Sequence, residues 1–158
     1  HIADSIAAGA TAIVDGRGAT AEGHPGGYWV GPTLLEDVTM DMKIAREEVF
    51  GPAVSLIRMD TLDDAIAAID ASEFGNAATI YTSHGGAARE FTQRVNIGNV
   101  GINVGVAAPM AFFPFSGRKN SFFGNLHGQA ADAVAFFTDP KVVVTRWPQR
   151  TDGREPWD

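Results

Sequence analysis

The sequence contains no cysteine among its 158 residues. Disulfide bonds, thiolate metal ligands and a cysteine nucleophile are therefore excluded within this stretch of chain. It has no apolar run near the roughly 20 residues that a membrane-spanning helix needs, and no run of five or more basic residues. Its 12 basic and 19 acidic side chains give a net charge of −7, which argues against nucleic acid or an anionic membrane as a partner.

What remains is the composition of an ordinary soluble globular protein, with 45% hydrophobic and 20% charged residues. A chain of this size buries roughly 70% of its unfolded surface, which is enough for a true core. No signal peptide opens the sequence, so we expect a cytoplasmic protein. The first residue is His1, and a helical pattern already runs through Ile2 and Ile6. We therefore interpret the chain as a piece of a longer protein.

Strands and helices are predicted to alternate between residues 53 and 104. The segments 53–58, 77–82 and 99–104 are largely apolar runs of strand length, as expected for strands that are buried on both faces. The order β-α-β-α-β with short connections predicts an α/β fold in which these strands form one parallel sheet with right-handed crossovers. Upstream, a short strand at 11–15 and an extended segment at 28–38 flank a glycine-rich loop.

The two segments between these strands carry the signals of amphipathic helices. Thr61 can cap the first helix, with Asp64 three residues later in an arrangement like a capping box. Apolar residues then recur at helical spacing along one face of each helix. They are Leu62, Ala65, Ile66 and Ile69 in the first helix, and Ala87, Ala88, Phe91 and Val95 in the second.

The C-terminal part of the chain has a different character. Residues 105–125 show no helical or strand period, and five of these 21 residues are phenylalanine. A loop of that length inside a compact domain is usually functional or disordered, and so much phenylalanine disfavours disorder. Beyond it we predict a helix at 128–137 and a strand at 141–147 that alternates around Val142 and Val144.

Two familiar site signals are missing. The four histidines show no metal-ligand spacing, so no metal site is predicted. The glycines of "GNVGINVG" do not match the dinucleotide-binding fingerprint, and they lie on a predicted strand.

The segment "REEVFGP" places two carboxylates and an aromatic ring before an apolar strand. On extended backbone Glu47 and Glu48 point to opposite faces, so they cannot act as a paired acid and base on one substrate. Glu48 and Phe50 share a face. A carboxylate suits a ligand that offers two hydroxyl donors, such as a ribose diol, and a phenyl ring offers a flat surface to a heterocycle. The residues alone favour the other interpretation, a strand-end charge beside a core phenylalanine.

The stretch "REEVFGPAVSL" resembles the E-E-I-F-G-P motif of the NAD(P)-dependent aldehyde dehydrogenase superfamily. Segments on both sides resemble further motifs of that family in the same order, among them "FGNAATIYT", "NIGNVGINV" and "PFSGRKNS". The similarity runs from about Ile2 to Trp147, so it covers nearly the whole chain. The chain therefore resembles a C-terminal part of such an enzyme.

This resemblance implies a fold and roles for particular residues. Residues 1–138 would form the C-terminal part of the α/β catalytic domain, and residues 149–158 a polar tail. Glu48 would bind the ribose on the nicotinamide side of NAD, and Phe50 would pack against the same end of the cofactor. Phe115 would line the pocket for the aldehyde.

The resemblance also implies a homo-oligomer. Residues 139–148 resemble the strand that joins a neighbouring subunit's sheet in dimers and tetramers of the family, and an alternating strand at the chain end suits such edge pairing. Asn103 matches a structural asparagine of the family and is assigned no chemistry.

One loop indicates a branch of the family. The stretch "FFPFSGRKNSFFGN" resembles the coenzyme-A-acylating methylmalonate-semialdehyde dehydrogenases, and Gly101 stands where most of the family has an aromatic residue. In that branch a cysteine thiolate attacks the small aldehyde, hydride passes to NAD, and coenzyme A resolves the thioester. Because this chain lacks the cysteine and the nucleotide-binding half, no catalytic residue is assigned within it and we expect the isolated chain to be inactive. Two alternatives stay open, a generic non-acylating aldehyde dehydrogenase and a free-standing interaction module without catalysis.

Overall fold

The first part of the chain forms a three-stranded sheet with two short helices. The structure is a computed structural model, and it describes residues 1–147. Strand β1 (Thr11–Val14) pairs antiparallel with β2 (Thr33–Glu36), and β2 pairs parallel with β3 (Ala53–Ser55). Helices α1 (Ile2–Ala7) and α2 (Lys43–Arg46) contact each other beside this sheet.

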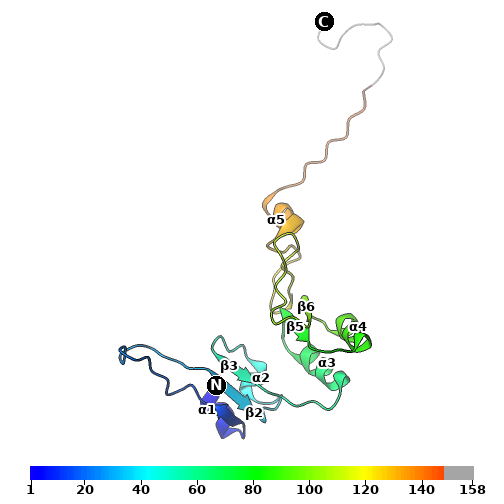
Figure 1. Cartoon of the computed structure of the whole chain (residues 1–158). Helices are drawn as coiled ribbons and strands as arrows, with labels where there is room; N and C mark the ends of the chain where they lie inside the picture. The colour runs from blue at the N-terminus through cyan, green and yellow to red at the C-terminus, as the bar shows by residue number, and fades with distance from the viewer. Residues whose placement is uncertain (148–158) are drawn as a thin grey trace, which may run out of the picture.

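The core of this first part surrounds the central strand. Leu35 of β2 is 0% exposed, and side chains from the neighbouring segments pack around it. They are Ala10, Val38, Met42 and Ile44. The long segment between β1 and β2 reaches away from the sheet, at the left of Figure 1.

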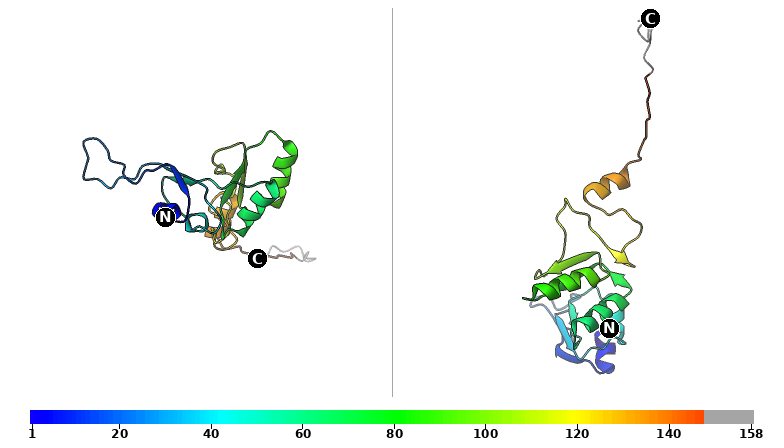
Figure 2. Two further views of the ribbon diagram at one scale, coloured as in Figure 1. Left: turned by 90° about the horizontal axis from the view of Figure 1, so that it is seen from below. Right: turned by 90° about the vertical axis from the view of Figure 1, so that its right-hand side faces the viewer.

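The second part is a β-α-β unit with an additional helix. Helix α3 (Leu62–Ala71) leads to β5 (Ala77–Ile80), which is joined through α4 (Gly85–Arg94) to the parallel strand β6 (Asn99–Ile102). Both helices lie beside the strand pair (Figure 2, left). A second apolar cluster lies between the two helices and the strand pair. It consists of Ile66, Phe91, Val95 and Ile97.

The predicted start of α3 is confirmed. Thr61 Oγ1 accepts a hydrogen bond from the backbone N–H of Asp64 at 3.1 Å, and its hydroxyl donates to the Asp64 carboxylate at 2.6 Å. This arrangement satisfies one of the free N–H groups at the helix start. Ile66 is the most deeply buried residue of the predicted apolar face.

The single parallel sheet predicted from the β-α-β-α-β order is not found. Strands β5 and β6 are parallel and connected by α4, as predicted, but β3 hydrogen-bonds to β2 in the other sheet. The apolar pattern marks which segments are strands, whereas the choice of neighbour depends on contacts between distant parts of the chain. Here the register Thr33–Ala53 to Leu35–Ser55 joins β3 to β2, and this pairing gives no periodic signal.

The phenylalanine-rich loop, residues 105–125, contains one short strand and leads to the last helix. Strand β7 (Arg118–Lys119) pairs antiparallel with β4 (Phe74–Gly75). Helix α5 (Ala130–Phe137) then stands away from the two packed parts, with an extended segment beyond it (Figure 1).

The strand predicted at residues 141–147 is not formed within this chain. Residues 138–147 have neither helix nor strand, and Val142 and Val144 are 86% and 92% exposed. A strand needs a neighbour to complete its backbone hydrogen bonds, and the described part of the chain supplies none here. Residue 148 and the predicted tail at 149–158 lie outside the described residues.

Within residues 1–147, no helix has the length and apolar character to cross a membrane.

Candidate cofactor and substrate surfaces

The segment that carries Glu48 and Phe50 follows directly after α2. Glu47 ends that helix with extended backbone (φ −103°, ψ 149°), and its carboxylate lies 3.7 Å from Lys43 Nζ and 3.6 Å from His1 Nε2. Val49 packs against the first apolar cluster. The side chains before and after it, Glu48 and Phe50, are exposed.

The exposure of Phe50 shows whether its ring belongs to the core of the described chain. A phenylalanine that served the core of this chain would be buried, but Phe50 is 99% exposed. Among the described residues, no hydrogen bond or ion pair engages the carboxylate of Glu48. Glu48 and Phe50 therefore form a surface on the outer side of Val49. Its free carboxylate can receive a diol, and its exposed aromatic ring can receive a flat ring.

A cavity of about 390 Å³ lies next to this segment, and Arg17, Val49 and Gly51 are among the residues that line it. The Arg17 guanidinium donates three hydrogen bonds to the Asp15 carboxylate, at 2.6 Å and 3.1 Å to Oδ2 and at 2.9 Å to Oδ1. These bonds lower the pKa of Asp15 to about 2. Glu48 and Phe50 flank the cavity without lining it.

A larger cavity, of about 620 Å³, lies where β6 meets the phenylalanine-rich loop. Asn99 donates from Nδ2 to the carbonyl oxygens of Asn76 and Ser116, which connects β6 to the loop. The loop backbone approaches very closely at Gly98, where a Cβ would lie 2.5 Å from the Cα of Gly117. A glycine at position 98 is therefore required for this contact.

Phe115 lies beside this larger cavity. Its neighbours Pro114 and Ser116 line the cavity, whereas Phe115 is not among the lining residues and is 40% exposed. The larger cavity shares no lining residue with the one near Glu48 and Phe50. The described residues therefore do not bring the predicted cofactor contacts and the predicted pocket residue into one site.

Asn103 has the structural role that was expected of it. Its backbone has φ +56°, a region that asparagine tolerates better than most residues. The side chain accepts from the N–H of Thr82 at 2.8 Å and donates to the carbonyl of Thr82 at 3.0 Å. These bonds join the chain beyond β5 to the chain beyond β6, beside the larger cavity.

Lys119 anchors the phenylalanine-rich loop, a role that the sequence reasoning missed. Its Nζ donates to the carbonyl oxygens of Ile69, Asp70 and Ser72 at 3.0–3.1 Å. These carbonyls lie at the C-terminal end of α3, whose last turn has no basic residue of its own. The last carbonyls of a helix need donors from elsewhere. The absence of a basic residue from the last turn of α3 therefore indicated that a donor comes from another part of the chain.

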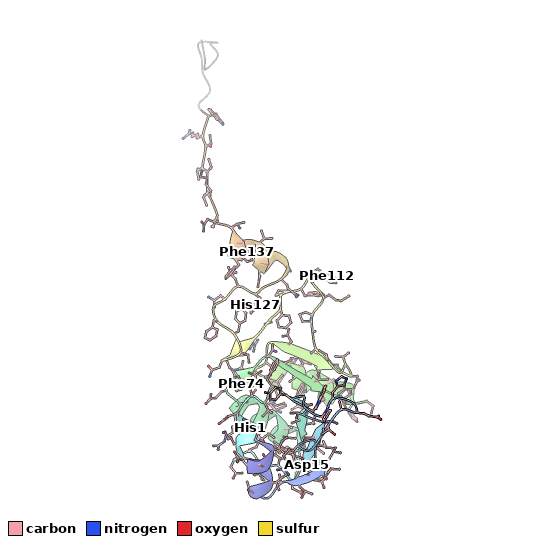
Figure 3. The ribbon with its side chains drawn as sticks, turned by 90° about the vertical axis from the view of Figure 1, so that its left-hand side faces the viewer. His1, Asp15, Phe74, Phe112, His127 and Phe137 are labelled. Carbon is pink, nitrogen blue, oxygen red and sulfur yellow. The ribbon has the colours of Figure 1, made fainter. Side chains whose placement is uncertain are left out.

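The sequence analysis considered the histidines only as metal ligands and gave no other role to His127. It lines the larger cavity, and its ring centroid lies 4.2 Å from that of Phe122. Figure 3 shows His127 between the packed body of the chain and Phe137 of α5.

Comparison with known proteins connects this chain to an enzyme family. The profile of the "Aldehyde dehydrogenase family" matches residues 1–143. A malonate-semialdehyde dehydrogenase of Halalkalibacterium halodurans is 48% identical over 139 residues, which are 88% of this chain and 28% of that protein. Malonate-semialdehyde dehydrogenase 3 of Bacillus cereus is 46% identical over 147 residues, or 93% of this chain and 30% of that protein.

Solved structures agree with this result. The methylmalonate-semialdehyde dehydrogenase of Oceanimonas doudoroffii superposes with a TM-score of 0.91 at 43% identity, covering 94% of this chain and 30% of that one. A protein of Sinorhizobium meliloti named for the same activity, and complexed with NAD, gives a TM-score of 0.91 at 40% identity, covering 95% and 30% of the two chains. The present chain spans less than a third of the length of these relatives. The chain belongs to the aldehyde dehydrogenase family.

Proposed function

We propose that this chain is part of an NAD-dependent aldehyde oxidoreductase that converts malonate or methylmalonate semialdehyde to an acyl-CoA. The observation that carries the proposal is the pair of exposed side chains Glu48 and Phe50, with Phe50 99% exposed in a segment that has the family's motif. The names of the most similar proteins support the substrate class.

In this proposal Glu48 and Phe50 hold one end of NAD, which supplies a hydride acceptor when it is bound. The Glu48 carboxylate accepts hydrogen bonds from the ribose hydroxyls, and the exposed ring of Phe50 packs against the nicotinamide end. The exposure of both side chains fits this group, since neither one is engaged in the core of the described chain.

The remaining chemistry has to come from elsewhere. The chain contains no cysteine, so the thiolate that attacks the aldehyde belongs to another part of the parent enzyme. Residues 1–138 contribute part of the catalytic domain, and Phe115, which follows a cavity residue, forms a wall of the aldehyde pocket in the assembled site. Coenzyme A then resolves the thioester.

We further propose that residues 139–148 join a neighbouring subunit of a homo-oligomer. The exposed valines of the extended segment support this, since Val142 and Val144 are 86% and 92% exposed. Apolar side chains of this kind commonly mark interaction surfaces.

The test is the formation of NADH by the full-length polypeptide that carries this sequence, with malonate semialdehyde and with or without coenzyme A. NADH formation that requires coenzyme A supports the proposal. Turnover that ignores coenzyme A would indicate a generic, non-acylating aldehyde dehydrogenase. No turnover of any short aldehyde would leave the non-catalytic interaction module. The isolated 158-residue chain should produce no NADH, because its sequence holds no nucleophilic thiol.

A further inference from the structure

Residues 116–121 form a strip of the phenylalanine-rich loop that is fixed to the packed body along its length. At the first end of the strip, Asn99 Nδ2 donates a hydrogen bond to the carbonyl oxygen of Ser116. The backbone of Gly117 lies directly against that of Gly98, where a Cβ would come within 2.5 Å of it. These contacts join the strip to β6 and to the residue before β6, so the strip has a defined position where it leaves the loop.

The other end of the strip is fixed to β4 and to the end of α3. The backbone N–H of Asn120 donates to the carbonyl of Glu73 at 3.0 Å, and Ser121 Oγ accepts from the N–H of Gly75 at 3.0 Å. Lys119 forms the strongest attachment, because its ammonium group donates to three carbonyl oxygens at the end of α3. Hydrogen bonds from a charged donor are stronger than those between neutral groups.

The backbone of Lys119 has an uncommon conformation. Its φ is +54°, in the left-handed region that few residues other than glycine, asparagine and aspartate adopt. Such a conformation persists only where the surrounding contacts determine it. Here the three bonds of the ammonium group and the pairing of Lys119 with Phe74 supply those contacts. The side chain of Lys119 therefore also holds the backbone of the strip.

Phe115 is the residue directly before this strip. Among the described residues, the segment 104–115 takes part in a single backbone hydrogen bond, which lies within the segment itself. The position of Phe115 therefore depends on the strip that follows it. Its neighbours Pro114 and Ser116 both line the cavity of about 620 Å³, so a shift of the strip moves this wall of the cavity.

We propose that Lys119 is a positioning residue for the aldehyde: by fastening the strip to the end of α3, it holds Phe115 in place as a wall of the aldehyde pocket. This inference rests on the proposed function, which assigns Phe115 to that wall. The hydrogen bonds of Lys119 go to α3 and the residue after it, and none reaches the segment of Glu48 and Phe50. Loss of the ammonium group should therefore affect the aldehyde and leave NAD binding unchanged.

A double-mutant cycle in the full-length polypeptide tests whether Lys119 acts through Phe115. Lys119→Met removes the ammonium group and keeps a long side chain. We expect kcat/KM for malonate semialdehyde to fall about tenfold, since a displacement of about 1 Å in a site can cost up to about 100-fold. KM for NAD should change less than about twofold. In a Phe115→Ala background, Lys119→Met should cost less than about a further twofold, because the wall that it positions is already absent.

Thr61→Ala is the matched control, since it removes the cap at the other end of α3 and leaves the strip untouched. It should keep the wild-type kcat/KM. Lys119→Gln, whose amide retains two donors, should give a smaller loss than Lys119→Met, and it takes the place of that variant if Lys119→Met does not fold. Equal losses in both Phe115 backgrounds, equal changes for aldehyde and NAD, or the same loss in Thr61→Ala would overturn the inference, because a residue that only stabilises the fold acts independently of Phe115.

A second readout needs no turnover. A para-fluorophenylalanine placed at position 115 of the full-length polypeptide reports the surroundings of this ring by fluorine NMR. We expect its resonance to shift in Lys119→Met and to match the wild type in Thr61→Ala. An unchanged resonance in Lys119→Met would overturn the inference even in an active enzyme. A shifted resonance in a polypeptide that oxidises no semialdehyde would uphold the positioning of Phe115 and refute the proposed function alone.

Discussion

At the scale of single residues, the proposed function depends on Glu48 and Phe50. Their motif predicted a shared outer face, and the structure shows both side chains exposed on either side of the inward Val49. What the motif alone could not decide was whether Phe50 belonged to the core. Burial depends on the surrounding chain rather than on the residue type, and 99% exposure removes the core interpretation for the described residues.

The first prediction concerns the carboxylate. In the full-length polypeptide, Glu48→Gln should lower kcat/KM for NAD about 10–100-fold, since charged hydrogen bonds contribute about 1.5–3 kcal/mol. The thermal stability should not change, because the side chain is exposed. Steady-state kinetics with varied NAD provide the measurement. Glu47→Gln is the control, since that carboxylate faces Lys43 and His1. Equal losses in both variants would contradict a specific role for Glu48.

A second prediction concerns the pKa of Asp15, which the hydrogen bonds from Arg17 lower to about 2 from the ordinary value of 3.8. Arg17→Gln should return this pKa toward 3.8, as followed by NMR titration of the carboxyl carbon. A lowered pKa means that any stability contributed by the pair is present above pH 3.8 and disappears as the pH falls through about 2. An unchanged titration in the variant would show that Arg17 is not the cause.

At the scale of helices and strands, local signals were read correctly and distant pairing was not. The Thr61 cap and the apolar faces of α3 and α4 follow from spacing within about ten residues, and the parallel pairing of β5 with β6 follows from the order strand, helix, strand. The pairing of β3 with β2 was missed because the same order also allowed β3 to join β5 and β6, and no period in the sequence distinguishes the two neighbours. The same limit applies to Lys119, whose three carbonyl partners lie 47 to 50 residues earlier in the chain.

The third prediction concerns this anchor. Lys119→Met should lower the free energy of unfolding of the chain by about 2 kcal/mol, because it removes charge-assisted hydrogen bonds from a half-buried ammonium to the end of α3. Urea unfolding of the 158-residue chain measures the effect. Lys141→Met, in the exposed segment after α5, should change stability by less than about 0.5 kcal/mol. A similar small change for Lys119→Met would mean that water replaces the lysine at no loss.

At the scale of the whole molecule, the exposed apolar surface is the main feature. Large apolar side chains are exposed on α5 and in the segment beyond it, where Phe137 is 82% and Trp147 84% exposed. This part of the chain projects from the packed body (Figure 2, right). The resemblance to a family with joined subunits predicted a strand here, but a strand between subunits cannot form within one chain. In the proposed homo-oligomer, a neighbouring subunit supplies its pairing partner.

A fourth prediction tests that assembly. In the full-length polypeptide, Val144→Asp should shift the sedimentation coefficient toward a smaller species, because a charge replaces an apolar side chain in the proposed interface. Lys141→Gln, which changes charge without removing apolar surface, should leave the assembly intact. Sedimentation velocity at several concentrations distinguishes the two. An unchanged oligomer in Val144→Asp would place the interface elsewhere.

The measurement that tests the central claim most directly is a crystal structure of the full-length polypeptide with NAD bound. We predict that the Glu48 carboxylate lies within hydrogen-bonding distance of the ribose hydroxyls and that the ring of Phe50 contacts the same end of the cofactor. A structure in which NAD is bound while Glu48 faces solvent, or pairs with a basic residue of the protein, would contradict the assignment of this surface.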